Sequence, residues 1–216
     1  MTNKIKYGVI GTGVMGQEHI QNINIIENAE VVAICDTNEN SRNQTKSLLK
    51  NSTKLYNDLN ELISKNIADA YIIATPNFTH INILEQILKT NKHLLIEKPL
   101  CTTTEDCKKF ELMSKNYSKI IWTGMEYRYM PPVKQLIKEV HNNVIGKIKM
   151  LSIREHRFPF LHKVDDWNRF AVNTGGTLVE KCCHFFDLMR LVIQSEPTKV
   201  YASGNQDVNH LSETYG

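Results

Sequence analysis

The sequence predicts an α/β fold, built as a doubly wound parallel sheet with helices on both faces, followed by a second region of different character. Two observations predict the sheet. Short apolar runs rich in β-branched residues alternate with helical stretches as far as Gly124, and a glycine-rich loop joins the first run to the first helix. The alternation stops after Gly124, so we expect one domain in 1–124 and another in 125–216.

The first domain is expected to contain buried strands separated by helices. The strands are the short apolar runs at 5–10, 30–35, 68–75, 93–97 and 119–124. The helices are the stretches at 15–28, 41–50, 58–63, 79–90 and 104–116. Because a helix separates most successive strands, neighbouring strands are expected to pair in parallel.

The second domain has too few predicted elements to cover a sheet on both faces. In chain order these elements are helix 131–141, an extended segment 147–156, a loop 157–173, helix 176–193 and a strand-like segment 199–203. A stable sheet needs more strands than this. We therefore expect either an incomplete domain or one that a partner chain completes.

Composition argues against several classes of protein. The 216 residues are 41% hydrophobic and 23% charged, as in a globular chain with one large domain, or one domain and part of another. The formal charge of +3 is small and scattered, which argues against a nucleic-acid partner. No apolar run approaches the roughly 20 residues of a membrane helix, and no leader-like segment precedes the first strand, so we expect a cytoplasmic protein without a membrane partner. The five cysteines lack zinc-like spacing, which predicts reduced thiols and no metal site.

The glycine loop has the pattern of a dinucleotide site. Its first glycine permits a sharp turn, the second lets a pyrophosphate approach the backbone, and the third lets the helix pack against the strand. Asp36 follows the loop by about 20 residues and ends the second strand. A carboxylate there binds ribose hydroxyls and repels a 2′-phosphate, which favours NAD, although NADP is possible if Arg42 reaches the ribose. The alternative is that Asp36 is only a turn residue. The predicted Rossmann unit binds its cofactor through Gly11, Thr12, Gly13, Val14, Met15, Gly16 and Asp36.

A second motif, Glu97-Lys98-Pro99, ends a later strand, and ligands bind at the carboxyl ends of parallel strands. Proline confines Lys98 to extended geometry and so fixes the direction of its ammonium group. With this motif, the chain resembles the glucose-fructose oxidoreductase and inositol dehydrogenase family, Gfo/Idh/MocA. The matching pieces are Gly11 to Gly16, Ala74-Thr75-Pro76-Asn77 with His80, Glu97-Lys98-Pro99, Tyr127-Arg128-Tyr129, and Gly175-Gly176 with Glu180 and His184.

The resemblance implies a fold, a cofactor site and a reaction. Family members join a Rossmann domain to an α+β substrate domain with a mainly antiparallel open sheet, and they are longer than this chain, so its second domain would be incomplete. His184 would act as general base on the alcohol proton, and Lys98 would stabilise the developing alkoxide or shuttle the proton. The further cofactor contacts that the resemblance implies are Thr75, Pro76, Asn77, His80, Glu97 and Lys98.

One position departs from the family pattern, which has an aspartate four residues before the histidine. Glu180 stands there, and its i, i+4 spacing from His184 predicts that both lie on one face of helix 176–193, with Asp187 further along that face. A nearby carboxylate would orient the imidazole and stabilise its charged form. The longer side chain of glutamate would move the carboxylate by about an ångström and change substrate choice or alignment. Lys181, next to it, is expected to be solvated.

Other residues are candidates for the substrate pocket. Tyr127 and Arg128 are expected to contact substrate or cofactor, with a structural role at the domain junction as the alternative. Trp167 would wall a sugar pocket and Arg169 would bind hydroxyl groups, with packing between domains as the alternative. The predicted substrate-binding set is Lys98, Tyr127, Arg128, Trp167, Arg169, Glu180 and His184.

The combined pattern predicts an NAD(P)-dependent dehydrogenase that moves a hydride between the nicotinamide and a sugar, inositol or related polyol. Its predicted catalytic residues are Lys98, His184 and Glu180. Two alternatives stay open: a non-catalytic, cofactor-binding regulator of the same family, and an inactive fragment of a longer dehydrogenase. Retention of both Lys98 and His184 argues against the regulator. Because family members usually associate through the outer face of the carboxy-terminal sheet, a homo-oligomer formed in this way is a further expectation.

Overall fold

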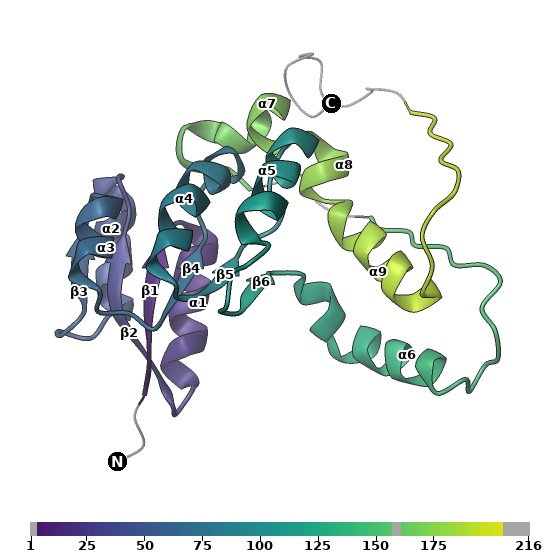
Figure 1. Cartoon of the computed structure of the whole chain (residues 1–216), viewed down its shortest axis with the longest axis horizontal. Coiled ribbons are helices and arrows are strands. Elements are labelled where there is room, and N and C mark those ends of the chain that lie inside the picture. Colours follow the sequence, from purple (N-terminus) through teal and green to yellow (C-terminus); the bar gives the residue numbers. More distant parts are fainter. Residues whose placement is uncertain (1–3, 157–160, 205–216) are drawn as a thin grey trace. The chain divides into compact units, whose positions relative to one another are not determined.

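A computed structural model describes residues 4–156 and 161–204 of the chain (Figure 1). The chain divides into two compact units. The first consists of Met1–Gly124 and Lys163–Trp167, and the second of Met125–His162 and Asn168–Gly216. Among the helices in the described ranges, none is long and apolar enough to cross a membrane.

The first unit contains a parallel sheet of six strands in the order β3-β2-β1-β4-β5-β6. The strands are β1 (Ile5–Ile10), β2 (Ala29–Cys35), β3 (Lys54–Tyr56), β4 (Ala70–Ile73), β5 (His93–Ile96) and β6 (Ile121–Thr123). In the centre, β1 pairs with β2 on one side and with β4 on the other. The strand order reverses at this point, and ligands bind beyond the carboxyl ends of strands at such a reversal. The predicted doubly wound Rossmann sheet is confirmed.

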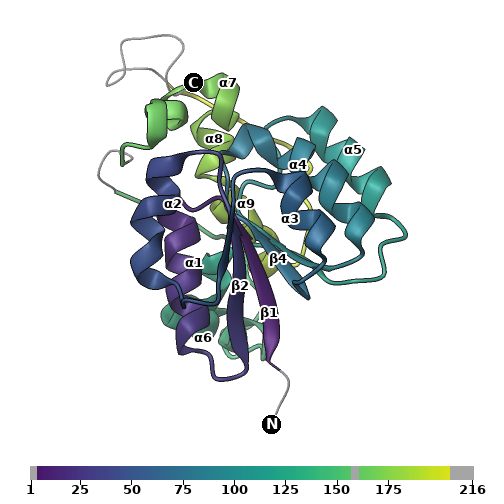
Figure 2. The ribbon, with the colours of Figure 1, turned by 90° about the vertical axis from the view of Figure 1, so that its left-hand side faces the viewer.

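Helices cover both faces of this sheet. They are α1 (Val14–Ile25), α2 (Glu39–Thr45), α3 (Leu59–Lys65), α4 (His80–Ile87) and α5 (Thr104–Ser114), with short 3-10 helices η1 (Lys46–Leu48), η2 (Asn77–Thr79) and η3 (Leu88–Thr90). Figure 2 shows α1 and α2 on one side of β1 and β2, with α3, α4 and α5 on the other. Side chains alternate across the sheet, so Val9 packs with Ile20 of α1, and Ile10 packs in the cluster that includes Leu84 of α4.

Polar side chains fix the starts of three of these helices. Asn38 accepts a hydrogen bond from the N–H of Ser41, and Asp58 accepts one from the N–H of Glu61. Thr103 caps α5 in the same way. Such a cap satisfies a backbone donor that the helix itself leaves unpaired.

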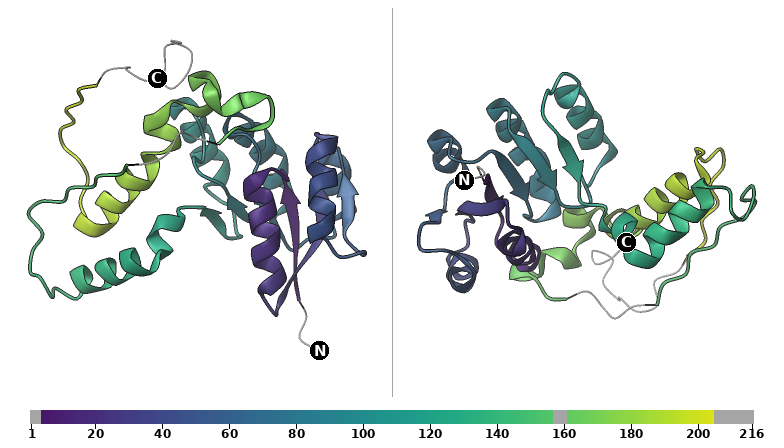
Figure 3. Two further views of the ribbon diagram at one scale, coloured as in Figure 1. Left: turned by 180° about the vertical axis from the view of Figure 1, so that it is seen from behind. Right: turned by 90° about the horizontal axis from the view of Figure 1, so that it is seen from below.

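The second unit consists of helices in its described residues. These are η4 (Glu126–Tyr129), α6 (Pro131–His141), α7 (Ala171–Thr174), α8 (Thr177–Glu180) and α9 (Cys183–Ile193), while η5 (Val164–Arg169) runs across the division between the units. Helices α6 and α9 lie side by side (Figures 1 and 3). Of the loop predicted for 157–173, residues 157–160 lie outside the described residues, and the remainder contains η5 and α7.

The predicted extended segments of the second unit do not form strands. Residues 147–156 and 199–203 are described, and neither is assigned to a strand. A strand is defined by backbone hydrogen bonds to a neighbour, and neither segment pairs with a partner strand among the described residues. The expected antiparallel sheet is therefore absent from the described part of this unit.

The single helix predicted over 176–193 is wrong. The carbonyl oxygen of Thr177 accepts hydrogen bonds from two successive N–H groups, those of Lys181 at 2.9 Å and Cys182 at 3.1 Å. The chain thus takes up one extra residue, which ends α8 and restarts the helix as α9 at Cys183. Extra residues of this kind in helices frequently occur at functional sites. Because of the break, Glu180 and His184 do not lie one turn apart on a continuous helix.

Candidate functional site

The glycine loop between β1 and α1 is closely packed beneath and open above Gly13. Gly11 has φ +88°, and a Cβ there would lie 2.6 Å from backbone atoms of Ala74. A Cβ on Gly16 would overlap the carbonyl oxygen of Gly11, whereas a Cβ on Gly13 would meet no described atom within 4 Å. The loop therefore leaves space over Gly13 at the amino-terminus of α1, where backbone N–H groups favour phosphate.

Asp36, directly after β2, is tied to this loop. Its carboxylate accepts hydrogen bonds from the Thr12 N–H at 2.7 Å, the Thr12 hydroxyl at 3.0 Å and the Asn38 N–H at 2.8 Å. A carboxylate has about four acceptor positions, so capacity is left for a ribose hydroxyl. Arg42 donates to the backbone carbonyl of Asp36 at 2.6 Å, which places its guanidinium beside this acid.

Asn77, in the loop after β4, has a buried amide. The residue is 6% exposed, and within the described residues its Nδ2 has no hydrogen-bond partner. The neighbouring Thr75 accepts a hydrogen bond from the Thr79 hydroxyl at 2.7 Å, which fixes the loop. A buried amide donor without a protein partner is costly, so this position fits one that a bound ligand completes.

His80 lies behind this loop and is 0% exposed. Its Nε2 lies 3.1 Å from the carbonyl of Thr75, and its Nδ1 lies 3.0 Å from that of Pro99 and 3.3 Å from that of Leu100. Burial lowers the pKa of His80, and the hydrogen bonds to these carbonyls oppose that shift. The imidazole links the two loops that follow β4 and β5, so any effect on the cofactor is exerted through them.

The burial of His80 predicts that acid lowers the free energy of unfolding of the protein. The folded protein keeps His80 neutral where the unfolded chain binds a proton, so the free energy of unfolding falls as pH drops through about 6.5. His80→Gln should be less stable than the parent at about pH 8, by about 1–3 kcal/mol, because the carbonyl that accepts the single N–H of the neutral imidazole loses its donor. Its deficit should shrink towards about pH 5, since the titrating group is gone. Urea unfolding at both pH values checks this, and a deficit that grows on acidification would contradict it.

Glu97, directly after β5, is paired with a residue that the sequence analysis missed. His19 Nε2 of α1 lies 2.6 Å from Glu97 Oε1. The other carboxylate oxygen of Glu97 accepts the N–H of Lys98 at 3.2 Å. His19 follows Gly16 by one helical turn, on the part of α1 that begins at the glycine loop, and this position is the signal that could have identified it.

Breaking this pair should destabilise the protein. His19→Leu leaves the buried Glu97 carboxylate without its closest hydrogen-bond partner, which should lower the free energy of unfolding by about 1–3 kcal/mol. The double variant His19→Leu/Glu97→Leu removes both polar groups and should recover part of that loss. Urea titration measures all three proteins. A double variant no more stable than His19→Leu alone would show that the pair does not account for the loss.

In the second unit, His184 is buried beside Tyr127. It is 2% exposed, and its ring stacks on that of Tyr127 with centroids 4.2 Å apart and planes 7° from parallel. Its Nε2 lies 3.4 Å from a carboxylate oxygen of Glu126. Glu180 is buried as well. The predicted contact between Glu180 and His184 stays a prediction.

Two further residues, the predicted substrate-binding Arg128 and Lys181, have partners within the second unit. Arg128 donates from Nε to Asp187 at 2.6 Å and forms a second hydrogen bond to it from Nη2. Lys181 is buried, so the expectation that it is solvated is wrong: its ammonium contacts Tyr127 and Glu155. Arg169 is partly buried.

Trp167 belongs to the first unit, where its ring packs edge-on against that of Phe78 at 6.4 Å. The contact joins the segment Lys163–Trp167 to η2, the 3-10 helix that contains Asn77. Its role as the wall of a sugar pocket stays a prediction.

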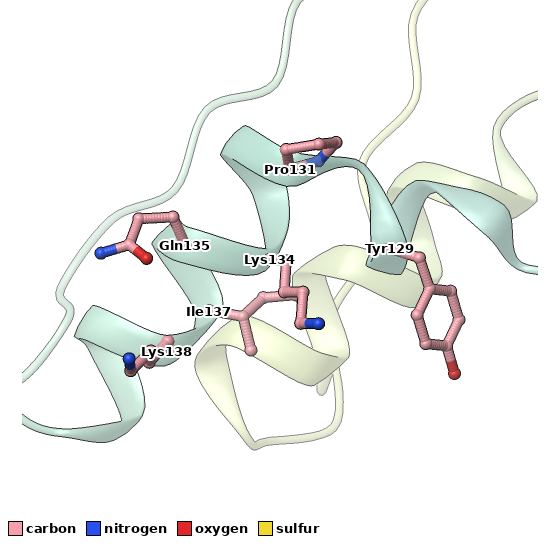
Figure 4. A pocket seen from close by; sticks show the side chains of 6 residues that line it. All are labelled: Tyr129, Pro131, Lys134, Gln135, Ile137 and Lys138. Atoms are coloured by element: carbon pink, nitrogen blue, oxygen red, sulfur yellow. The ribbon is translucent and has the colours of Figure 1, made fainter.

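A surface pocket of about 640 Å³ lies along α6 (Figure 4). Its lining residues come from this helix and the turn before it: Tyr129, Pro131, Lys134, Gln135, Ile137 and Lys138. None of the predicted site residues lines it, so it does not define the functional site.

Models of known protein families match most of the chain. Residues 5–125 match the family model described as the Gfo/Idh/MocA oxidoreductase family, NAD-binding Rossmann fold, and residues 137–215 match the model of its C-terminal alpha/beta domain. The chain belongs to the Gfo/Idh/MocA oxidoreductase family. Residues 5–125, which make up most of its first unit, match the NAD-binding Rossmann fold of that family.

Several relatives of this Gfo/Idh/MocA protein are named as dehydrogenases. It is 30% identical to the myo-inositol 2-dehydrogenase of Thermotoga maritima over 201 residues, covering 93% of this chain and 58% of the relative. A crystal structure of a probable dehydrogenase from Thermotoga maritima has a TM-score of 0.80 at 29% identity and covers 95% of this chain and 60% of that one. The myo-inositol dehydrogenase of Lactobacillus casei, solved with NAD(H) and myo-inositol, has a TM-score of 0.62 at 31% identity. The match covers 66% of this chain and 43% of that one. The chain thus spans less than two thirds of the length of these relatives.

Proposed function

We propose that this Gfo/Idh/MocA protein is an NAD-dependent dehydrogenase that transfers a hydride between the nicotinamide and a sugar, inositol or related polyol. The observation that carries the proposal is the open space over Gly13 at the start of α1, with Asp36 tied to the same loop. The family of NAD-binding oxidoreductases and the relatives named as inositol dehydrogenases support it.

The residues of the first unit fit a bound dinucleotide. The loop from Gly11 to Gly16 would hold the pyrophosphate, and Asp36 would accept hydrogen bonds from the adenosine ribose. The buried Nδ2 of Asn77 has a free donor position, and Thr75, Pro76, Glu97 and Lys98 occupy the neighbouring loop ends. When bound, NAD supplies the hydride acceptor; this chain supplies its orientation. The guanidinium of Arg42 beside Asp36 leaves NADP as a second, weaker ligand.

The proton chemistry is assigned to His184, Glu180 and Lys98. His184 acts as general base on the substrate hydroxyl, and the carboxylate of Glu126 near its Nε2 stabilises the charged imidazole. Lys98 stabilises negative charge on the substrate oxygen. Glu180, buried at the end of α8, orients the imidazole of His184. We assign 1–124 to cofactor binding, and 125–216, as part of an α+β domain, to the substrate and to self-association.

The test is cofactor binding together with turnover. The purified protein is expected to bind NAD with a heat signal in calorimetry, and to change the nicotinamide absorbance with at least one member of a panel of inositols, aldoses and sugar alcohols. Binding without turnover on the whole panel would overturn the dehydrogenase and leave a cofactor-binding protein. Absence of NAD binding by a folded protein would overturn the cofactor assignment too.

A further inference from the structure

Lys181 is a buried lysine at the break between α8 and α9. It is 8% exposed, and lysines are almost never buried without a partner, because the ammonium group loses strong hydration. Its Nζ lies 3.2 Å from a carboxylate oxygen of Glu155, which compensates the charge. The N–H of Lys181 is one of the two that donate to the carbonyl of Thr177, so Lys181 lies at the point where α8 ends.

The second partner of Lys181 is the hydroxyl group of Tyr127. An ammonium group has only donors, so the phenol oxygen accepts this hydrogen bond and the hydrogen of the phenol must point elsewhere. The Nζ also lies 4.6 Å from the centroid of the Tyr127 ring. Lys181 therefore fixes both the position of the ring and the direction in which its hydroxyl can donate.

Tyr127 in turn controls the plane of His184. The two rings are nearly parallel, with centroids 4.2 Å apart, so the imidazole cannot rotate without displacing the phenol. With Nε2 of His184 lying 3.4 Å from Glu126, one face and one edge of the ring are held. If Lys181 served stability alone, Glu155 would suffice as its partner. Its contact with Tyr127 instead connects it to His184.

We propose that Lys181 is a positioning residue: its ammonium group holds Tyr127 against His184 and leaves the Tyr127 hydroxyl to donate a hydrogen bond to a hydroxyl or carbonyl oxygen of the substrate. The part that concerns the substrate rests on the proposed function. The part that concerns the ring of His184 does not. The two parts are therefore tested by separate measurements.

The first measurement needs no turnover. Lys181→Met removes the ammonium group and keeps a side chain of similar length. In the folded variant, the NMR resonance of the His184 ring proton is expected to lose the ring-current shift that the stacked phenol causes. The exposed Lys134 of α6 supplies the control, and Lys134→Met should leave that resonance unchanged. NAD affinity should be the same in all these proteins. An unchanged His184 resonance in folded Lys181→Met would overturn the proposal.

The second measurement uses turnover. Lys181→Met and Tyr127→Phe should each lower kcat by about 10- to 100-fold, with a smaller change in the KM for NAD. The double variant should be no slower than the worse single variant, because both changes remove one chain of contacts. If the two substitutions lowered kcat by factors that multiply in the double variant, Lys181 would not act through Tyr127, and the proposal would be overturned.

Two controls keep these outcomes distinct. If the parent protein turns over no polyol, the proposed function fails, yet the NMR comparison still decides the position of the His184 ring. If Lys181→Met does not fold, Lys181→Gln keeps a donor for Glu155 with a shorter side chain, and the same loss of ring-current shift is expected. Failure of both variants to fold would assign Lys181 to stability alone and overturn the proposal.

Discussion

Replacing Gly13 with alanine should weaken NAD binding sharply while the protein folds as before. Gly13 has φ −66°, which alanine adopts easily, and its Cβ would meet no described atom. The free energy of unfolding should therefore change by less than about 1 kcal/mol, the cost of a poorer residue at the helix cap. The methyl group would occupy the space that we assign to the pyrophosphate. An overpacked contact of this kind costs about 1–3 kcal/mol, or about 5- to 150-fold in Kd. Calorimetric titration with NAD measures it.

The matched variant is Gly16→Ala, which should lose folding stability, whereas Gly13→Ala should lose NAD affinity. A Cβ at Gly16 would overlap the backbone of Gly11, so the loop has to shift in the protein without cofactor. We expect its free energy of unfolding to fall by about 1–3 kcal/mol before any NAD is added. If Gly13→Ala bound NAD as tightly as the parent, the space over Gly13 would not be the pyrophosphate site. Equal losses of stability in both variants would show that the two glycines differ less than their surroundings indicate.

The sequence predicted the Rossmann sheet well, because its strands are buried on both faces and read as apolar runs. The strand that it missed, β3, has only three residues, and two of them, Lys54 and Leu55, are exposed. No apolar run marks such an edge strand; its pairing with β2 defines it. The break between α8 and α9 was missed for a related reason. It depends on which carbonyl accepts the N–H of Cys182, and a periodic pattern does not record this.

The candidate site likewise contains residues that the sequence predicts and contacts that only the fold shows. The glycines and Asp36 were predictable, since their chemistry follows from spacing along the chain. The pairs His19–Glu97 and Lys181–Tyr127 were not, because their members lie far apart in sequence and meet only in the fold. The hydrogen bond from the Thr12 N–H to the Asp36 carboxylate is a contact in the fold between two residues that were predictable from the sequence. It connects residues that the sequence had placed separately at the cofactor, and it shows that Asp36 also holds the loop.

Lys98→Met should remove most of the turnover while retaining most of the affinity for NAD. We assign the ammonium group to the substrate oxygen, where charge develops in the reaction, and the loss of such a group lowers kcat by about 10²- to 10⁴-fold. The backbone around it should stay in place, because Glu97 accepts the N–H of Lys98 and is itself held by His19. The measurements are steady-state kinetics with the best polyol of the panel and calorimetric titration with NAD.

The exposed Lys89 of η3 provides the control, since Lys89→Met removes the same charge from the same unit. It should leave both kcat and NAD affinity unchanged, so any effect of net charge is excluded. His184→Gln should lower kcat by a similar factor to Lys98→Met, and the double variant should be little slower than either single one, because residues that act on one proton transfer are strongly non-additive. If Lys98→Met instead lost NAD binding by as large a factor as it lost kcat, its ammonium group would serve the cofactor alone. The proton chemistry would then have to rest on His184 and its carboxylates.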